Sequence, residues 1–232
     1  MPANNTSILI TGELAEGLLQ QLTSKGFNVD VIPFIKTESI QPAIIQQEIE
    51  RIATLDATVI FTSGNAVEAV SPLLLNKKIN WKVYCVGEKT KSLAEKLLAG
   101  ITLAAVADNA IHLSQKIIGD NNAAEVYFFC GDKRRDELPA LLLQENMHVH
   151  EVKVYTTTVF RYKLSKPYNA VLFFSPSAVK GFFSANTIHA PTALFAIGDT
   201  TAAEIRKYTS ANIIMSEQPG KKELVEKLLA FF

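Results

Sequence analysis

The sequence predicts an α/β protein with parallel sheets, and three observations lead to this fold class. Short apolar runs rich in β-branched residues alternate with longer amphipathic patterns along the whole chain. Glycine or a small hydroxyl residue follows most of the short runs, where a parallel strand turns into a helix. The segments of the first half recur in the same order in the second half, which predicts two similar domains with a cleft between them.

The first half begins with a predicted buried strand at residues 7–11, which ends at Gly12. The helix at residues 14–22 carries leucines on one face and stops at Gly26, because glycine favours helix C-termini. Ser63 is placed to cap the helix that follows residues 58–62. The elements predicted after Gly26 are strands at 29–35, 58–62 and 82–86 and helices at 41–55, 66–75 and 90–98.

The second half repeats this alternation of strands and helices. Its first strand, at residues 126–130, ends at Gly131, and a strand at 149–157 follows the next helix. Glycine also ends the last predicted strand, at Gly198. The elements predicted beyond the first strand are helices at 138–144, 175–183 and 200–207 and strands at 149–157, 170–174 and 193–197.

The repetition is close enough to be aligned residue by residue. Residues 59–67 match residues 171–179, and residues 84–87 match residues 195–198, with a threonine three positions after each glycine. The segment before Gly12 likewise matches the segment before Gly131. The chain therefore carries two kinds of unit, each present twice, and units can pair across the repeat as easily as within it.

Composition limits the classes of partner. The 232 residues include 23 Lys and Arg and 23 Asp and Glu, so no net charge attracts nucleic acid or an anionic membrane.

The sequence also predicts a cytosolic protein. The first residues lack a basic segment before their apolar run, and no apolar run approaches the length of a membrane helix. Cys85 and Cys130 each lie in an apolar run, as buried reduced thiols do.

The candidate site lies in the strand-to-helix turns, because ligands of parallel α/β sheets bind at the carboxyl ends of the strands. Such turns offer free backbone N–H groups and small hydroxyls, which suit carboxylates or phosphates. Glycine and serine also occupy these positions for purely structural reasons, but six similar turns favour an anionic ligand. The turns are Gly12, Ser63–Gly64, Gly87–Thr90, Gly131–Asp132, Ser175–Ser177 and Gly198–Thr201.

Other candidate residues are few. Dinucleotide, phosphate-loop, esterase and zinc-protease signatures are absent, and His148 and His150 lack a third ligand, so no metal site is predicted. Lys133, Arg134 and Arg135 follow the Gly131 turn, where cations are unusual unless an anion binds nearby. Tyr155 lies where the strand at 149–157 leaves one repeat, and its phenol is either a packing group or a proton donor.

These segments together resemble the uroporphyrinogen-III synthase family. The resemblance runs in the family's order over nearly the whole chain. It is carried by residues 60–63 with 66–69, 83–87 with Thr90, 130–131 with Arg135 and 138–139, 152–156, 173–177, and 196–198 with 200–202.

The resemblance implies an enzyme that cyclises hydroxymethylbilane, a linear tetrapyrrole with eight carboxylates, to uroporphyrinogen III. Water is lost and ring D is inverted, through an azafulvenium cation and a spiro-pyrrolenine. The family implies no cofactor, a monomer, transient contact with the preceding pathway enzyme, and Tyr155 as the group that assists hydroxyl departure. The substrate would bind at Ser63, Gly64, Thr90, Gly131, Lys133, Arg135, Ser175, Ser177, Gly198, Thr200 and Thr201.

The resemblance also implies two flavodoxin-like or Rossmann-like domains joined by a two-stranded β linker. One domain would contain residues 1–34 and 157–232, and the other residues 35–156. The strand at 7–11 would then share no sheet with the strand at 58–62.

This chain has Asn65 and Cys130 where many relatives carry basic residues, so Lys133 and Arg135 are expected to supply more of the positive charge. Two alternatives remain from the residues alone. One is a non-catalytic two-lobed protein that binds a small polyanion. The other is a nucleotide or flavin enzyme, which bound-cofactor absorbance would reveal.

Overall fold

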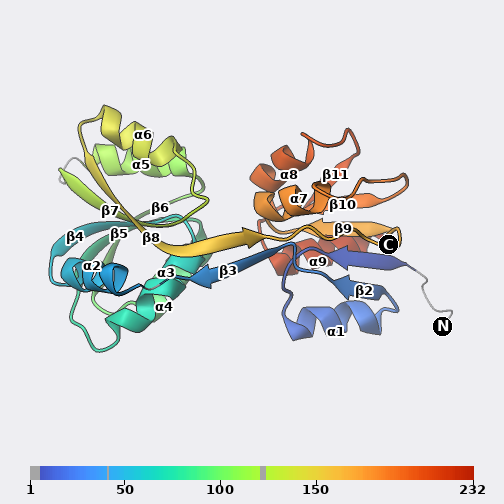
Figure 1. Cartoon of the computed structure of the whole chain (residues 1–232), viewed down its shortest axis with the longest axis horizontal. Coiled ribbons are helices and arrows are strands. Elements are labelled where there is room, and N and C mark those ends of the chain that lie inside the picture. The colour runs from blue at the N-terminus through green and yellow to red at the C-terminus, as the bar shows by residue number, and fades with distance from the viewer. Residues whose placement is uncertain (1–5, 41, 121–123) are drawn as a thin grey trace. The chain divides into compact units, whose positions relative to one another are not determined.

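The computed structural model describes residues 6–40, 42–120 and 124–232, and the chain divides into two compact units (Figure 1). Unit 1 contains Met1–Lys36 and Thr158–Phe232, and unit 2 contains Thr37–Thr157. The chain thus leaves unit 1 once and returns to it once. The first residue of the helix predicted at 41–55 lies outside the described residues.

Unit 1 is a parallel sheet with helices on both faces (Figure 1). Its described strands follow the order β11-β10-β9-β1-β2. The strands are β1 (Ser7–Ile10), β2 (Asn28–Val31), β9 (Ala170–Phe173), β10 (Ala193–Ala196) and β11 (Ile213–Met215). The helices are α1 (Glu16–Ser24) and α9 (Lys221–Phe231) on one face, and α7 (Pro176–Phe183) and α8 (Asp199–Ile205) on the other.

The central strand β1 explains why both faces of this sheet need helices. Side chains alternate between the faces of a strand, and every apolar residue of β1 is buried. Ile8 and Ile10 pack in a cluster with residues of α1 and α9. Leu9 points to the opposite face, where Phe182 of α7 and Ile205 of α8 lie. A strand that is apolar on both faces is stable only between two helical layers.

Unit 2 has the same layered construction (Figure 1). Its described strands follow the order β3-β8-β7-β4-β5-β6. The strands are β3 (Ile35–Ser39), β4 (Asp56–Phe61), β5 (Asn80–Val86), β6 (Ile101–Ala107), β7 (Glu125–Gly131) and β8 (His148–Val159). On one face lie α2 (Ala43–Ala53), α3 (Gly64–Val70), a 3₁₀ turn at Ser71–Leu74 and α4 (Glu88–Leu97), and on the other α5 (Ala110–Gly119) and α6 (Glu137–Gln144).

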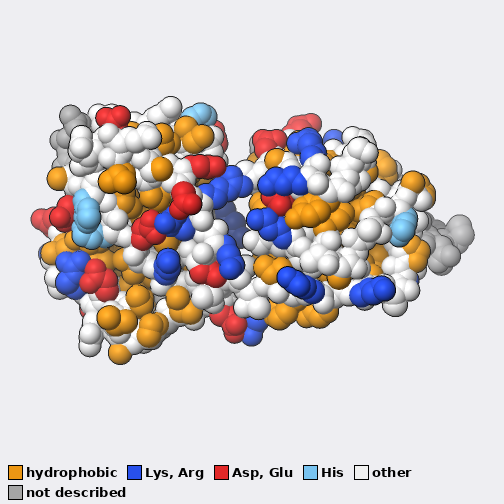
Figure 2. All heavy atoms as spheres, turned by 45° about the horizontal axis from the view of Figure 1, so that its top comes forward, with side chains coloured by type: hydrophobic (Ala, Val, Ile, Leu, Met, Phe, Trp, Pro, Cys, Tyr) orange, Lys and Arg blue, Asp and Glu red, His pale blue; other side chains and the backbone are white. Residues whose placement is uncertain are grey.

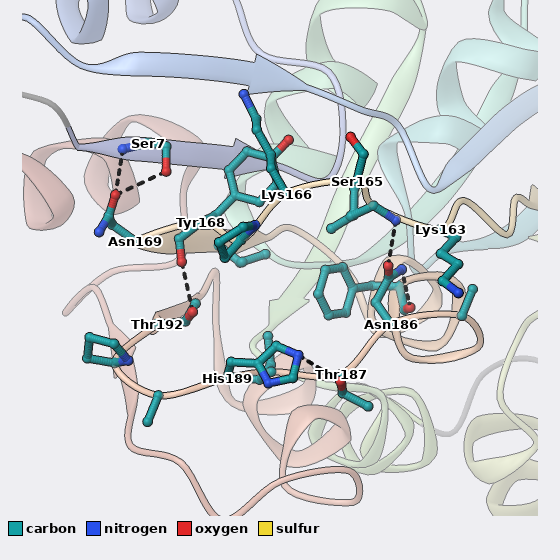
Figure 3. Close-up of a pocket in the computed structure, with 18 residues that line it drawn as sticks. Ser7, Lys163, Ser165, Lys166, Tyr168, Asn169, Asn186, Thr187, His189 and Thr192 are labelled. Atoms are coloured by element: carbon teal, nitrogen blue, oxygen red, sulfur yellow. Dashed lines mark hydrogen bonds between the residues drawn. The ribbon is translucent and has the colours of Figure 1, made fainter.

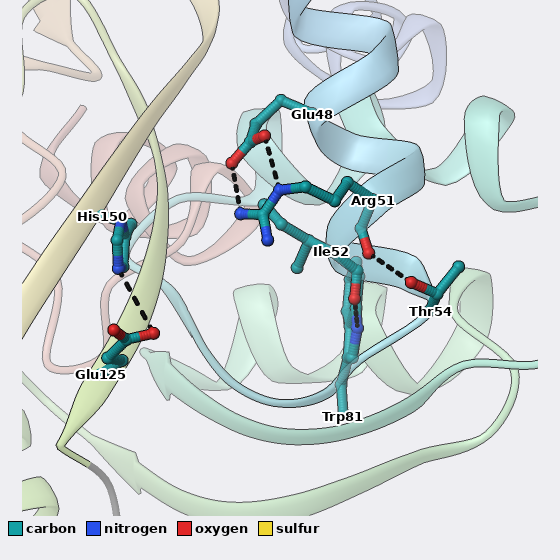
Figure 4. Close-up of polar contacts among 7 residues, drawn as sticks. All are labelled: Glu48, Arg51, Ile52, Thr54, Trp81, Glu125 and His150. Atoms are coloured by element: carbon teal, nitrogen blue, oxygen red, sulfur yellow. Dashed lines mark hydrogen bonds and ion pairs between the residues drawn. The ribbon is translucent and has the colours of Figure 1, made fainter.

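Polar contacts fix α2 on its face of this sheet (Figure 4). The buried Trp81 indole of β5 donates a hydrogen bond of 3.1 Å to the Ile52 carbonyl near the end of α2. This bond satisfies an indole N–H that would otherwise be buried without a partner. Arg51 instead pairs with Glu48 along the same helix, at 2.7 Å, on the solvent side. The indole bond therefore adds to the apolar packing that holds α2 on the sheet, and the exposed pair contributes little.

Each sheet joins strands from both halves of the chain. In unit 1, β1 pairs in parallel with β9, with Leu9 opposite Val171. In unit 2, β4 pairs in parallel with β7, with Ile60 opposite Phe128. β1 therefore shares no sheet with β4, as predicted for the strands at 7–11 and 58–62.

β3 and β8 are neighbours at the edge of the unit 2 sheet. The Ile40 N–H donates to the Val154 carbonyl at 2.9 Å, and the Phe160 N–H donates to the Phe34 carbonyl at 2.8 Å. Residue numbers rise on one segment as they fall on the other, so the two segments run antiparallel. All other pairings described in this sheet are parallel.

Several predicted elements need correction. The strand predicted at 29–35 is two strands, β2 and β3, which belong to different sheets. Pro33 lies between them, and proline interrupts a strand because it has no N–H to donate. Sequence analysis assigned no element to β6, α5, β11 or α9. β6 contains alanines that weaken the strand pattern, and β11 has only three residues.

The two cysteines are confirmed as buried, free thiols. Burial raises the pKa of Cys85 to about 12 and that of Cys130 to about 11, so neither is a thiolate at neutral pH. Among the described residues, no helix has the length and apolar character that crossing a membrane requires.

We expect Gly100→Ala to destabilise the protein. Gly100 has φ +84°, and a Cβ there would lie 2.5 Å from the Ile79 carbonyl oxygen. The cost should be at least about 1 kcal/mol, since both the left-handed backbone and the contact oppose a side chain. The measurement is the urea midpoint. Gly119→Ala is the matched control, because its Cβ would meet no atom within 4 Å. Equal midpoints for the two variants would contradict the expectation.

Candidate functional site

The predicted site residues occupy turns at the carboxyl ends of parallel strands in both units. In unit 2 these turns follow β4, β5 and β7, and in unit 1 they follow β9 and β10. Because neighbouring strands are parallel, the turns of each unit lie at one edge of its sheet.

Tyr155 and Gly131 are in direct contact in unit 2. Gly131 ends β7 and faces Tyr155 of β8, where the register between the two strands shifts. A Cβ on Gly131 would overlap the ring carbons of Tyr155. Only glycine leaves room for the phenol here. Gly131 was predicted as a ligand-binding residue, and in the structure it makes space for the Tyr155 ring.

The Tyr155 phenol is held in its protonated form. Burial raises its pKa above the ordinary value, and the negative charge of the nearby Asp132 carboxylate acts in the same direction. A hydrogen bond with the Ser63 hydroxyl lowers the pKa and offsets part of this effect. The ring is nevertheless only partly buried. The phenol can therefore donate a proton or a hydrogen bond at neutral pH.

Asp132 fixes the strand that carries Tyr155. Its backbone N–H donates to the Tyr155 carbonyl at 3.1 Å, and its carboxylate accepts the Thr157 N–H at 2.8 Å. Sequence analysis placed Asp132 in a turn but did not include it among the site residues. Its position directly after Gly131 is the only sequence signal for this role.

Ser63 and Ser175 play equivalent roles in the two units. The Ser63 hydroxyl accepts the Asn65 N–H at 3.2 Å at the start of α3, and the Ser175 hydroxyl accepts the Ala178 N–H at 3.1 Å at the start of α7. Such an N-cap uses an oxygen lone pair and leaves the Ser175 O–H free to donate, whereas the Ser63 hydroxyl also bonds the Tyr155 phenol. The equivalence of the two caps is consistent with an internal duplication.

Gly64 and Ser177 complete these serine turns. Gly64 packs closely, since a Cβ there would lie 2.6 Å from Leu93 Cδ1. Ser177 follows Pro176, which has no N–H, so the donors of this turn come from Ser175 and Ser177. Both residues are half-buried and reach solvent.

Gly87 and Gly198 begin α4 and α8 without any side-chain cap. Thr90 and Thr201, three residues after each glycine, are buried, so only a small part of each side chain can reach a ligand. Thr200 is exposed. Each helix also carries an acid at its first position, Glu88 in α4 and Asp199 in α8, and this negative charge disfavours an anion there. The serine turns are thus the better anion sites.

The three basic residues after Gly131 behave differently. The Arg134 guanidinium is largely buried and pairs with Glu151 at 2.5 Å and with Asp136. Lys133 and Arg135 are more than half exposed, with weaker partners at 3.5 Å (Asp132) and 3.9 Å (Glu137). Lys133 and Arg135 therefore keep charge for a ligand, whereas Arg134 is structural. Figure 2 shows charged side chains of both signs spread over the visible face, as zero net charge implies.

The turn between β6 and α5 lies at the same edge of unit 2. It was not predicted, because the sequence patterns indicated neither β6 nor α5. The Asn109 side chain caps α5 by accepting the His112 N–H at 2.9 Å. Beside it lies a hollow of about 370 Å³ lined by Asp108, His112 and Lys116 with their neighbours. An asparagine before an apolar helical pattern is the N-cap signal that could have located this turn.

His148 and His150 do share a face of β8, with ring centroids 4.3 Å apart. His150 stacks on Tyr127 and lies 3.5 Å from Glu125 (Figure 4). Within residues 6–40, 42–120 and 124–232, no group of three or more His, Cys, Asp or Glu residues is arranged to hold a metal ion. The histidines are therefore part of a packed polar cluster.

Comparison with known proteins agrees with this arrangement. Two solved structures cover nearly all of this chain at 16% identity. The uroporphyrinogen III synthase of Thermus thermophilus has a TM-score of 0.69, with 97% of each chain covered. The uroporphyrinogen-III synthetase of Helicobacter pylori has a TM-score of 0.66, with 98% of this chain and 100% of that chain covered. These likenesses show the fold, and a comparison with curated proteins gave no significant match.

A family model described as uroporphyrinogen-III synthase HemD matches residues 16–226. The match includes Ser63, Tyr155 and Ser175 and extends over both units. Because the model spans almost the whole sequence, this chain belongs to the uroporphyrinogen-III synthase family.

Proposed function

We propose that this protein cyclises hydroxymethylbilane to uroporphyrinogen III with loss of water and inversion of ring D. The family match over residues 16–226 carries this proposal. Units 1 and 2 would be the two domains of the enzyme. The alternative of a non-catalytic polyanion-binding protein gains no support from the family match.

Tyr155 is the proposed acid for the first step. The hydroxyl of the substrate leaves as water after taking a proton, and the azafulvenium cation remains. A phenol that stays protonated at neutral pH and lies beside Gly131, at the carboxyl end of β7, fits this role. The substituted α-carbon of ring D then attacks the cation, and the spiro intermediate opens and recloses. The proton lost from ring D at reclosure balances the one consumed.

The proposed substrate contacts are hydroxyl and backbone donors in each unit. Ser63 and Gly64 in unit 2, and Ser175 and Ser177 in unit 1, are the strongest candidates, because their helices carry no acid in the first turn. Lys133 and Arg135 would add charge beside Tyr155. The remaining proposed positions are Thr90, Gly131, Gly198, Thr200 and Thr201. Holding many carboxylates fixes the conformation of the chain, which is how an enzyme excludes the wrong closure.

We also propose that the enzyme works as a cytosolic monomer and receives its unstable substrate by transient contact with the preceding pathway enzyme.

The direct test is an assay with hydroxymethylbilane generated in situ. Products are oxidised, and isomers I and III are separated by chromatography. We expect isomer III to rise with the amount of protein added. If folded protein yields isomer I alone at the uncatalysed rate, the proposed function is wrong.

Tyr155→Phe should lower turnover about 10²-fold or more, because general acids contribute on this scale. The KM should change little, since the ring and its packing against Gly131 remain. Tyr162→Phe is the matched control, because Tyr162 is an exposed tyrosine outside the candidate site. Unchanged turnover in Tyr155→Phe would remove the phenol as the acid.

Arg135→Gln and Arg134→Gln should separate binding from stability. Arg135→Gln is expected to raise KM several-fold, with an effect that shrinks as salt increases, because exposed charges are screened.

Arg134→Gln should instead lower stability by about 1–3 kcal/mol, since Glu151 loses its partner. Steady-state kinetics and urea unfolding measure the two effects. A stable Arg134→Gln protein with a raised KM would reverse the assignment.

A further inference from the structure

Unit 1 contains a cavity of about 730 Å³ that involves none of the turns described above (Figure 3). Two loops form its walls, one at residues 163–169 before β9 and one at residues 185–192 before β10. Ser7, at the start of β1, also lines it. The cavity therefore lies at the amino ends of these strands, opposite the edge that carries Ser175. Its volume is within the range of small-molecule sites.

The floor of the cavity is apolar. Phe182 of α7 and Val171 of β9 belong to the buried core, and Leu164 and Ile188 add apolar surface from the two loops. A ring system or a similar apolar body could rest on this floor. Burial of such a body provides most of the affinity of small-molecule sites.

The walls are fixed by hydrogen bonds within the protein (Figure 3). The Asn186 side chain accepts the Leu164 N–H at 2.8 Å and donates to the Tyr162 carbonyl at 2.6 Å, which ties one loop to the other. Thr192 donates to the Tyr168 carbonyl at 2.8 Å. The loops are thus braced without a ligand, so binding would cost little ordering.

The charge around the cavity is positive. Its lining includes Lys163, Lys166 and His189 but no aspartate or glutamate. Lys166 is neutralised by Asp30 at 2.6 Å, outside the lining. Lys163 forms no ion pair with any residue that the structure describes, and the His189 ring lies 3.3 Å from the Thr187 hydroxyl. A cation without a partner therefore stands at the edge of an apolar cavity.

We propose that this cavity is a second ligand site, which binds a small organic anion with an apolar body, such as an aromatic carboxylate or sulfonate. The body would rest on Phe182 and Ile188, and the anionic group would pair with Lys163. The site is independent of the proposed synthase chemistry, because none of its residues belongs to the candidate active site.

The test uses a fluorescent aromatic sulfonate, 8-anilinonaphthalene-1-sulfonate, and its neutral analogue N-phenyl-1-naphthylamine. Lys163→Glu should weaken sulfonate binding about tenfold or more and leave the neutral probe unaffected, because only the anion pairs with the lysine. Ala185→Trp should weaken both probes, because Ala185 lines the cavity and the indole would fill it. Lys227→Glu and Ala230→Trp are the matched controls, since both residues are exposed on α9.

Location and folding are checked separately. Backbone amide shifts on adding the sulfonate should concentrate at residues 163–169 and 185–192. Circular dichroism and isomer III formation should be unchanged in the variants, which distinguishes loss of the site from loss of the fold or of the synthase function. Should Ala185→Trp fail to fold, the Lys163→Glu comparison decides. Sulfonate binding that is absent up to about 1 mM, insensitive to Lys163→Glu, or mapped to the Ser63 and Ser175 turns overturns the proposal.

Discussion

Parallel pairing between distant strands holds each unit together. β1 has β2 on one side and β9 on the other, and β9 lies more than 150 residues along the chain. Without β9, Leu9 of β1 would lose Val171 and Phe173 from its cluster, and the helices α7 and α8 would lose part of the apolar surface that they cover. In unit 2, β7 stands in the same relation to β4. Such non-local contacts form late and at a high entropic cost, so neither half of the chain can complete a unit alone.

The same pairing builds the candidate active site. Gly131 and Tyr155 face each other because β7 and β8 are adjacent, and Ser63 reaches the phenol because β4 is the next strand beyond β7. Three neighbouring strands thus bring together Gly131, the proposed proton donor Tyr155 and its hydrogen-bond partner Ser63. The raised pKa of Tyr155 is a property of this arrangement, because burial causes most of it.

Sequence patterns predicted the fold class, because strands buried on both faces are continuous apolar runs and glycines mark their ends. They predicted β4 and α3 closely, where Ser63 supplies a cap. They predicted a single strand where the structure has β2 and β3. Hydrophobicity alone does not show that the run is divided at Pro33 between two sheets. The roles of Gly131 and Arg134 were also beyond sequence analysis. Both depend on contacts across strands, with Tyr155 in one case and Glu151 in the other.

The sheet of unit 1 separates two kinds of polar chemistry. At the carboxyl ends of its strands, hydroxyls and helix N-termini offer neutral donors, which suit an anion held by many weak contacts. At the amino ends, helices provide no such donors, and the cavity there relies on an apolar floor and the Lys163 ammonium. A polycarboxylate suits the first edge, because each carboxylate needs only a few N–H or O–H partners. A compact anion with one charge and a hydrophobic body suits the second. The two proposed sites at the edges of this sheet therefore suit ligands of different chemical class.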